Sequence, residues 1–358
     1  MKNIKVLFQN RPTINSLPGG DVVQMNKTKE YLEKLGLKIN ISTELSPDVS
    51  PYDLVHVFNI ETPLSTLAQV RNAKRDNKPV VLSTIFSYIP DQYRYYSFYH
   101  YGKYHFIKKN LPNIVNRKIH RYLYNKELRI EKMILKFVDL ILPNSEIEMQ
   151  QMKEVFGSNL PTHTTITNAV DFTTFENASS KKIEEQYGVR DFVLEVGRIN
   201  FVKNQLNLIK AMEYLDIPLV LIGQQTEKRY YELCQREAKK CKNVIFIPHT
   251  EQNELKDFYA AAKVHVLPSF RETTGLVSLE AALCGCNLVA STFGCHRAYL
   301  HDFAEYCEPD DPESIRKSIL KAYRKPKNSQ FSNYIKENYT WEKAAQQTLD
   351  AYQKLFMH

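Results

Sequence analysis

The sequence of 358 residues has no long hydrophobic run. Its longest apolar segments, such as Val80–Leu82 and Val138–Pro143, are far shorter than the roughly 18 residues that a membrane-spanning helix needs. Residues Met1–Phe8 are typical of a short buried strand rather than of a secretion signal, which has a charged head and a long apolar segment. The sequence therefore predicts a cytoplasmic protein whose only membrane contact would be peripheral, at the inner face.

Cysteine is scarce and unevenly placed. All six cysteines lie in the C-terminal half, without the paired CxxC or mixed Cys/His spacing of a zinc site. Cysteines that lie close together after a helix more often serve as small side chains that pack in the core than as redox partners. We expect reduced thiols in the core, rather than disulfides or metal ligands, at Cys234, Cys241, Cys284, Cys286, Cys295 and Cys307.

Strong compositional bias is also missing, which excludes collagen-like, low-complexity and disordered proteins. Hydrophobic residues make up 43% of the chain and charged residues 25%, as in ordinary globular proteins. A chain of this length exceeds what one hydrophobic core usually serves, so two domains are expected. The formal net charge of +8 suits nucleic acid, anionic lipid or phosphorylated substrates, and the charge alone does not choose among them.

Short apolar runs alternate with segments of helical period in both halves of the chain, which predicts parallel sheets. The rhythm pauses in a polar stretch between Val170 and about Lys182, where we expect a linker. The fold class is therefore predicted as α/β, with two Rossmann-like, doubly wound domains, 1–172 and 183–335, that face each other across a cleft. The expected strands are 4–8, 54–58, 80–85 and 140–142 in the first domain and 192–197, 219–223, 244–247, 264–267 and 288–290 in the second.

The segment Pro268–Ala282 combines a strand end, a polar turn and a helix. Two carboxylates are eight positions apart, with Glu272 in the turn and Glu280 inside the helix, so they cannot have the same role. A helix that begins near Gly275 directs free N–H groups and partial positive charge towards the end of the strand. The segment therefore predicts a site for an anion such as phosphate.

The segment Gly197–Asn204 also follows a strand, and it carries two cations. Arg198 can bind two phosphate oxygens at once, and Lys203 supplies a mobile point charge. Together they suit a diphosphate. A third feature, the Gly19–Gly20 pair between the first strand and the first helix, is either a plain flexible turn or a loop that presents N–H groups to a phosphate or sugar.

Three motifs occur in the order seen in glycosyltransferase family 4, namely Gly-Arg-x4-Lys, Glu-x7-Glu and the Asn-Ala-Val-Asp step at Asn168–Asp171. The chain resembles this family over nearly its whole length. The resemblance implies the GT-B architecture and the transfer of a sugar, with retention at the anomeric carbon, from a nucleotide diphosphate donor. It also implies that no metal or other cofactor is needed.

The resemblance further implies roles for individual residues. Gly197, Arg198 and Lys203 would hold the donor diphosphate, and both cations would neutralise the leaving group. Glu272 would accept hydrogen bonds from hydroxyls of the donor sugar, and Glu280 from the ribose. The backbone around Thr274, Gly275 and Leu276 would contact the phosphates of the donor. The loop of Gly19 and Gly20 would close over the phosphate or the acceptor.

The sequence departs from the family at two positions. Phe86 aligns where many members carry a histidine at the end of the fourth strand, and Asn287 stands where proline is common. An inactive nucleotide-sugar-binding regulatory partner and a sugar-nucleotide epimerase, which can share the architecture, therefore remain alternatives to a transferase. The two charged motifs favour transfer over epimerisation.

An aromatic and basic stretch spans Tyr93–Lys136. Its residues suit the headgroup region of an anionic membrane, which would present a lipid-linked acceptor, or they stack on the sugars of a glycan acceptor. Packing on the first domain or on another subunit is the structural alternative. No RNA-binding motif accompanies the stretch, so nucleic acid is not expected. The candidate contacts for acceptor or membrane are Tyr95, Tyr96, Tyr99, Lys108 and Lys109.

These features together predict a hexosyltransferase of surface polysaccharide or glycoconjugate synthesis. The last helix, 340–358, is assigned to the first domain because in the resembling family it crosses back to that domain. Leu349, Tyr352 and Phe356 have helical spacing and predict its buried stripe.

Overall fold

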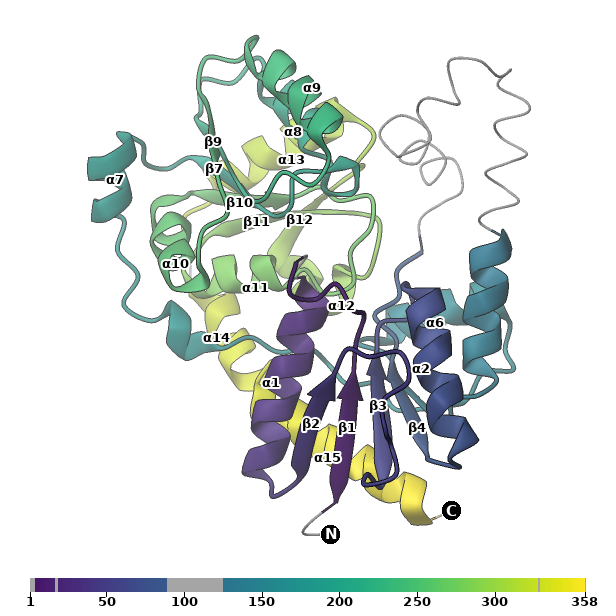
Figure 1. The fold of residues 1–358 in the computed structure, drawn as a ribbon. Coiled ribbons are helices and arrows are strands. Elements are labelled where there is room, and N and C mark those ends of the chain that lie inside the picture. The colour runs from purple at the N-terminus through teal and green to yellow at the C-terminus, as the bar shows by residue number, and fades with distance from the viewer. Residues whose placement is uncertain (1–3, 17–18, 89–124, 328, 358) are drawn as a thin grey trace, which may run out of the picture. The chain divides into compact units, whose positions relative to one another are not determined.

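The computed structural model describes residues 4–16, 19–88, 125–327 and 329–357. Within these residues the chain forms two compact units (Figure 1). Unit 1 contains residues 4–88, 125–169 and 339–357, and unit 2 contains residues 170–338. The chain therefore leaves unit 1 after Ala169 and returns to it at Tyr339.

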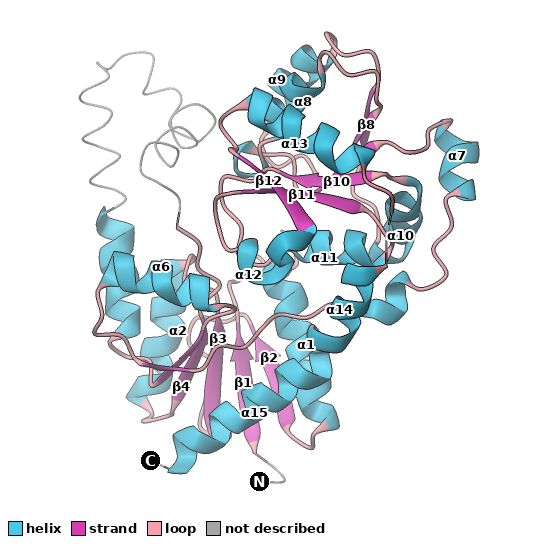
Figure 2. Ribbon diagram, turned by 180° about the vertical axis from the view of Figure 1, so that it is seen from behind, coloured by secondary structure: helices cyan, strands magenta, loops and turns pink. Residues whose placement is uncertain are grey.

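Unit 1 is a six-stranded parallel sheet with strand order β2-β1-β3-β4-β5-β6. Figure 2 shows helices on both faces of its magenta strands. Its elements are β1 (Lys5–Gln9), α1 (Gly20–Lys34), β2 (Lys38–Ser42), β3 (Leu54–Phe58), α2 (Pro63–Arg75), β4 (Val80–Ser83), a helix at 125–135, β5 (Leu140–Leu142), α6 (Glu146–Phe156), β6 (Thr162–His163) and α15 (Trp341–Met357).

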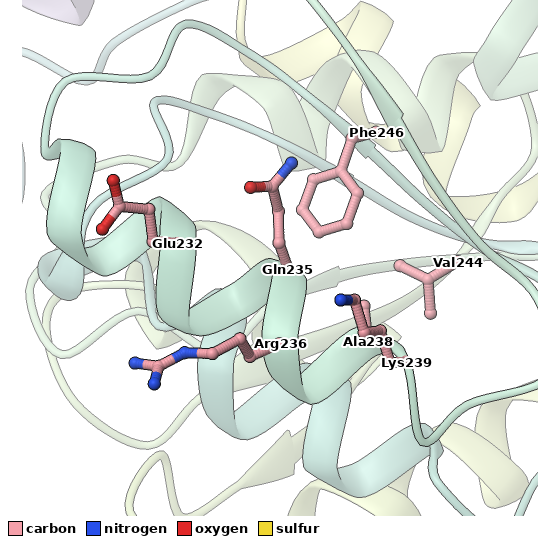
Figure 3. Close-up of a pocket in the computed structure, with 7 residues that line it drawn as sticks. All are labelled: Glu232, Gln235, Arg236, Ala238, Lys239, Val244 and Phe246. Atoms are coloured by element: carbon pink, nitrogen blue, oxygen red, sulfur yellow. The ribbon is translucent and has the colours of Figure 1, made fainter.

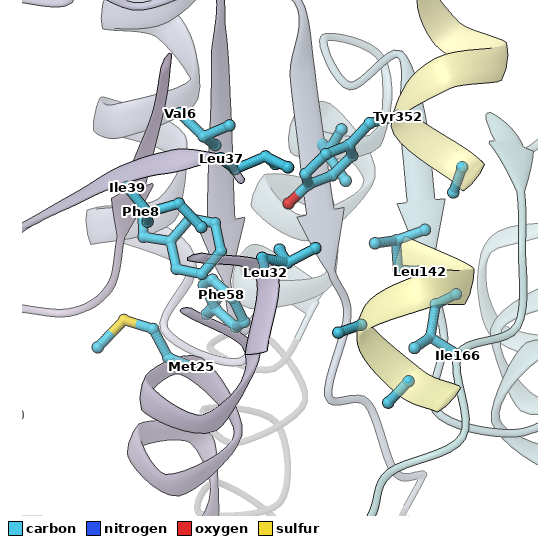
Figure 4. Packing of buried hydrophobic residues seen from close by; sticks show 14 of the residues in the cluster. Val6, Phe8, Met25, Leu32, Leu37, Ile39, Phe58, Leu142, Ile166 and Tyr352 are labelled. Carbon is cyan, nitrogen blue, oxygen red and sulfur yellow. The ribbon is translucent and has the colours of Figure 1, made fainter. Parts of the chain in front are cut away.

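Strand alternation gives unit 1 two cores, one on each face of the sheet. In β1, Val6 and Phe8 point into the core that α1 and α15 cover, whereas Leu7 points into the opposite core. The opposite core receives Val70 of α2 and Met152 of α6. Figure 4 shows the first of these cores, in which side chains of the strands, such as Val6 and Phe8, pack with side chains of the two helices, such as Met25 and Tyr352.

Helix α15 packs on unit 1 and is fixed there by a buried polar contact. Trp341 and Tyr352 belong to the core shared with β1 and α1. The Tyr352 hydroxyl lies 2.5 Å from Nδ1 of His56, whose Nε2 lies 2.9 Å from the Ser83 hydroxyl. The predicted buried stripe is wrong at Phe356, which is 39% exposed because it lies near the end of the helix.

Unit 2 is a second six-stranded parallel sheet, with order β12-β11-β10-β7-β8-β9. Its elements are η1 (Phe172–Phe175), α7 (Lys181–Tyr187), β7 (Val193–Val196), η2 (Phe201–Lys203), α8 (Gln205–Met212), β8 (Leu219–Ile222), α9 (Lys228–Ala238), β9 (Val244–Ile247), α10 (Gln252–Ala261), β10 (Val264–Leu267), α11 (Leu276–Leu283), β11 (Asn287–Ser291), α12 (Arg297–Leu300), η3 (His301–Phe303), β12 (Ala304–Cys307), α13 (Pro312–Arg324) and α14 (Gln330–Asn338).

The strand order of unit 2 reverses between β7 and β10. Helices α8, α9 and α13 cover one face of this sheet, and α10 and α11 cover the other (Figure 1). Connections from β7 and from β10 therefore leave the sheet towards opposite faces, and α/β proteins bind ligands at such a reversal, beyond the carboxyl ends of the strands. Loops that follow these two strands are the expected place for a ligand.

Among the described residues, no helix is both long enough and apolar enough to cross a membrane.

The contact between Tyr352 and His56 predicts a measurable loss of stability. Tyr352→Phe removes one hydroxyl and leaves a buried ring nitrogen of His56 unpaired, which costs about 1–3 kcal/mol. Urea unfolding should show a lower midpoint for this variant. The control Tyr214→Phe, at a side chain that is 73% exposed, should leave the midpoint unchanged. Equal midpoints for Tyr352→Phe and the parent would contradict the role assigned to this contact.

Candidate functional site

The loops after β7 and β10 are bound to each other at the strand-order reversal of unit 2. Asn204 Nδ2 donates to the Pro268 carbonyl at 2.9 Å and to the Pro309 carbonyl at 2.6 Å. The Phe270 N–H donates to the Val202 carbonyl at 2.8 Å, and its ring stacks on Phe201 with centroids 4.8 Å apart. These contacts hold the two predicted charged segments in one place.

Lys203 and Glu272 form an ion pair that joins the two loops. Their side chains are 17% and 15% exposed. The methylene groups of Lys203 cover Gly197, since a Cβ at Gly197 would lie 3.5 Å from them. Burial alone raises the pKa of the Glu272 carboxyl. The charge of Lys203, together with smaller effects of His296, of the Lys203 hydrogen bond and of Arg271, outweighs burial, so that this pKa lies below its ordinary value.

Helix α11 begins beside this pair. Gly275 precedes it with φ of +71°, a left-handed conformation that favours glycine, and it provides no side-chain cap. Thr274 is buried, and Leu276 is the first helical residue. Backbone N–H groups in the first turn of a helix lack partners within the helix, and the helix dipole makes this end attractive to anions. The site thus combines a lysine with a helix N-terminus.

Glu280 lies one turn into α11 and is buried. Its carboxylate accepts hydrogen bonds from Gln252 Nε2 at 2.7 Å and from the Tyr259 hydroxyl at 3.1 Å, both on α10. Burial raises the pKa of Glu280 to about 7, although both hydrogen bonds oppose this rise. A carboxylate can accept further hydrogen bonds, so these two contacts leave capacity for a ligand.

Arg198 follows β7 and is exposed. Its charge acts on Glu227, whose pKa burial raises and Arg198 lowers in part. The structure thus gives Lys203 and Arg198 different acidic neighbours, Glu272 for the lysine and Glu227 for the arginine.

Sequence reasoning missed several buried polar residues near these loops. Glu195 on β7 accepts a hydrogen bond from Gln205 Nε2 at 2.9 Å, and burial raises its pKa. His265 on β10 and His296 before α12 are also buried. A charged residue inside the apolar run Phe192–Val196 is a signal that could have identified Glu195. His265, inside the apolar run Val264–Leu267, gave a similar signal. His296 gave none, because its neighbours come from other elements.

In unit 1, Gly19 precedes α1 in an extended conformation, and Gly20 is the first helical residue. Arg11 Nε lies 3.0 Å from Asp21 Oδ2, and a Cβ at Gly19 would lie only 2.8 Å from Asp21 Oδ1. An ion pair therefore stands next to the glycine loop. The predicted contacts at Tyr95, Tyr96, Tyr99, Lys108 and Lys109 lie outside the described residues.

Phe86 is buried and packs against Phe156, with ring centroids 5.3 Å apart. Its N–H donates to the Glu148 carboxylate at 2.9 Å, and burial raises the pKa of Glu148 to about 7. The expected strand to Ile85 ends at Ser83, because Ile85 has φ of +47°, which an extended strand does not allow. The position of the expected histidine is thus occupied by a core side chain.

No disulfide joins any of the six cysteines, all of which lie within the described residues, and burial raises the thiol pKa of Cys286 to about 12. Within the described part of the chain, no group of three or more His, Cys, Asp or Glu side chains is arranged to hold a metal ion. A hollow lined by α9 and β9 contains Arg236, Lys239 and Phe246 (Figure 3). It includes Val244, at the amino end of β9, so it lies away from the carboxyl edge that carries Lys203.

Residues 176–340, which include nearly all of unit 2, match the family model of glycosyl transferases group 1. The D-inositol 3-phosphate glycosyltransferase of Xylanimonas cellulosilytica is 24% identical over 243 residues, which cover 62% of this chain and 58% of that protein. This chain spans about half the length of the curated relatives it matches.

Solved structures match the whole chain. Sucrose-phosphate synthase from Thermosynechococcus elongatus has a TM-score of 0.76 at 17% identity, with 99% of each chain covered. HepE from Anabaena, solved in complex with UDP and glucose, has a TM-score of 0.74 at 16% identity, with 98% of this chain and all of that chain covered. The predicted fold class, an α/β protein with two doubly wound parallel sheets of the GT-B type, is confirmed.

The raised pKa of Glu280 predicts a pH-dependent stability. The folded protein holds this proton up to about pH 7, whereas the unfolded chain loses it near 4.5, so stability falls as pH rises between these values, by roughly 3 kcal/mol at most. Glu280→Gln should therefore lose less thermal stability than the parent between about pH 5 and about pH 8. The control Glu251→Gln, at a side chain that is 79% exposed, should behave as the parent. A Glu280→Gln slope equal to that of the parent would refute the raised pKa.

Proposed function

We propose that this protein is a retaining glycosyltransferase of the family 4 type, which transfers a sugar from a nucleoside diphosphate sugar to a hydroxyl of a glycan or lipid-linked acceptor. The observation that carries the proposal is the Lys203–Glu272 pair beside the N-terminus of α11, at the strand-order reversal of unit 2. A cation, a carboxylate and free helix N–H groups suit the two parts of such a donor, its diphosphate and its sugar hydroxyls.

The diphosphate is the leaving group, and its negative charge grows as the bond to the sugar breaks. Lys203, Arg198 and the start of α11 would neutralise this charge, which lowers the barrier because the interaction is strongest in the transition state. The backbone of Gly197, Thr274, Gly275 and Leu276 would line the phosphates. Glu280 would accept hydrogen bonds from the ribose.

Lys203 and Glu272 bind each other in the absence of donor, and each would exchange this contact for a contact with the donor. Lys203 would turn to the diphosphate, while Glu272 would accept hydrogen bonds from the sugar hydroxyls. Both groups are mostly buried, so neither can exchange its partner for bulk water at low cost. The ion pair therefore keeps both charges satisfied until a molecule with both functions arrives.

The reaction requires no protein nucleophile. The bond between the anomeric carbon and the phosphate oxygen breaks, and the acceptor oxygen forms its bond on the same face. The acceptor proton passes to the departing phosphate oxygen, so that a nucleoside diphosphate and the glycoside are the products. Delivery to the face that the phosphate leaves gives retention. UDP-glucose is the first donor to test, since HepE was solved with UDP and glucose.

An acceptor in polysaccharide or glycoconjugate synthesis, at the inner face of a membrane, remains our proposal for the other substrate. It rests on the aromatic and basic composition of Tyr93–Lys136. In unit 1, we propose that Gly19 and Gly20, next to the Arg11–Asp21 pair, contact the acceptor or the phosphate.

Donor binding is tested by thermal shift with a panel of UDP-, GDP- and ADP-sugars. One nucleotide sugar should stabilise the parent, by about 2.7 kcal/mol at a concentration 100 times its Kd. Lys203→Gln, which keeps a donor for Glu272 but removes the charge, should need far more ligand for the same shift. The control Lys242→Gln, on a side chain that is 75% exposed, should match the parent. A panel without any stabilising nucleotide sugar would refute the proposal.

Turnover is tested with the donor that the panel identifies, as release of nucleoside diphosphate. Arg198→Ala and Lys203→Gln should each lower the rate about 100-fold, as expected for loss of one group that stabilises developing charge. Because the two cations replace a metal ion in this proposal, the parent should keep its rate after dialysis against EDTA. Rates near that of the parent in both variants, or loss of activity with EDTA that Mg²⁺ restores, would contradict this mechanism.

A further inference from the structure

His296 lies in unit 2, in the loop between β11 and α12, and its side chain is 1% exposed. Neither ring nitrogen has a hydrogen-bond partner. Nearly all buried polar groups in folded proteins are hydrogen-bonded, so a fully buried imidazole without partners requires an explanation. One such explanation is a partner that becomes available only when the site is occupied.

The loop that carries His296 is built against Glu272. The Cys295 N–H donates to the Glu272 carbonyl at 3.0 Å. Gly294 has φ of +79°, and a Cβ there would lie 2.4 Å from the same carbonyl oxygen, so only glycine allows this close approach. These contacts fix the position of His296 relative to Glu272.

The ring of His296 also lies against the start of α11. Its Nδ1 is 3.3 Å from the point where a Cβ of Gly275 would stand. Partial positive charge at a helix N-terminus favours a lone pair on the facing atom, so the ring proton belongs on Nε2. Burial lowers the pKa of His296 to about 4, against an opposing effect of Glu272, and the imidazole is therefore neutral. Its Nε2–H is a buried donor that needs an acceptor.

We propose that His296 is a positioning residue of the donor site, which donates a hydrogen bond from Nε2 to the Glu272 carboxylate once a bound diphosphate draws Lys203 away. The inference rests on the function proposed above. Without such a replacement, the mostly buried carboxylate would lose its charged partner when Lys203 departs, and the sugar hydroxyls alone would have to hold its orientation. With it, Glu272 stays ionised and oriented towards the sugar hydroxyls.

A different role would be direct binding of a phosphate by His296. Two ligands, one with a sugar and one without, distinguish this role from positioning of Glu272. Inorganic pyrophosphate contains the diphosphate but no sugar, so its binding does not need an oriented Glu272. The nucleotide sugar with the largest shift in the panel above contains both parts. A larger loss of nucleotide-sugar binding than of pyrophosphate binding is therefore specific to positioning.

The test uses the full chain with His296→Leu and His296→Gln, and Kd values from calorimetry. His296→Leu should raise the Kd for the nucleotide sugar about 10-fold more than the Kd for pyrophosphate, because both ligands draw Lys203 from Glu272 but only the sugar needs an oriented carboxylate. His296→Gln, whose amide N–H reaches about as far as Nε2, should restore most of the sugar-dependent binding and of the turnover.

His265→Leu is the matched control, because His265 is equally buried and its Nε2 also lacks a partner. It should lower Tm to a similar extent while leaving the ratio of the two Kd values unchanged. Unchanged binding in His296→Leu, a parallel loss of both ligands or a failure of His296→Gln to restore binding would overturn the inference. Failure of the parent to bind any nucleotide sugar would instead refute the proposed function itself.

Discussion

The ion pair between Lys203 and Glu272 depends on one feature of the fold, the adjacency of β7 and β10 in the sheet of unit 2. The two residues are 69 positions apart in the chain and meet only because these strands are neighbours whose connections leave in opposite directions. The same adjacency lets Asn204 bind the Pro268 carbonyl. The candidate site is thus a consequence of strand order.

The sequence predicted the buried strands well and the half-exposed elements poorly. Strands β3 and β10 have their predicted bounds because they are short apolar runs that are buried on both faces. The strand β2 (Lys38–Ser42) was missed because its side chains are mostly polar and exposed, at the edge of the sheet. The helix α6 was missed although Met149, Met152 and Phe156 have helical spacing and Ser145 caps its first turn.

The sequence predicted which residues belong to the candidate site but not which of them form pairs. Arg198, Lys203 and Glu272 lie in loops that follow strands, which indicated an anion site. Two cations and the start of a helix suit an anion at such a position. Nothing local indicated that Lys203 would bind Glu272, because the pairing follows from strand order. For the same reason the sequence did not predict that His296 lies next to Gly275 and close to Glu272, which belong to another loop.

The central claim is that the lysine of this ion pair and the start of α11 form a single diphosphate site. The most direct measurement is a crystal structure of the full chain with inorganic pyrophosphate. We expect pyrophosphate oxygens to accept hydrogen bonds from Lys203 Nζ and from backbone N–H groups at the start of α11, with Lys203 released from Glu272. Pyrophosphate bound elsewhere, such as the hollow beside α9, with the Lys203–Glu272 pair intact, would contradict the account.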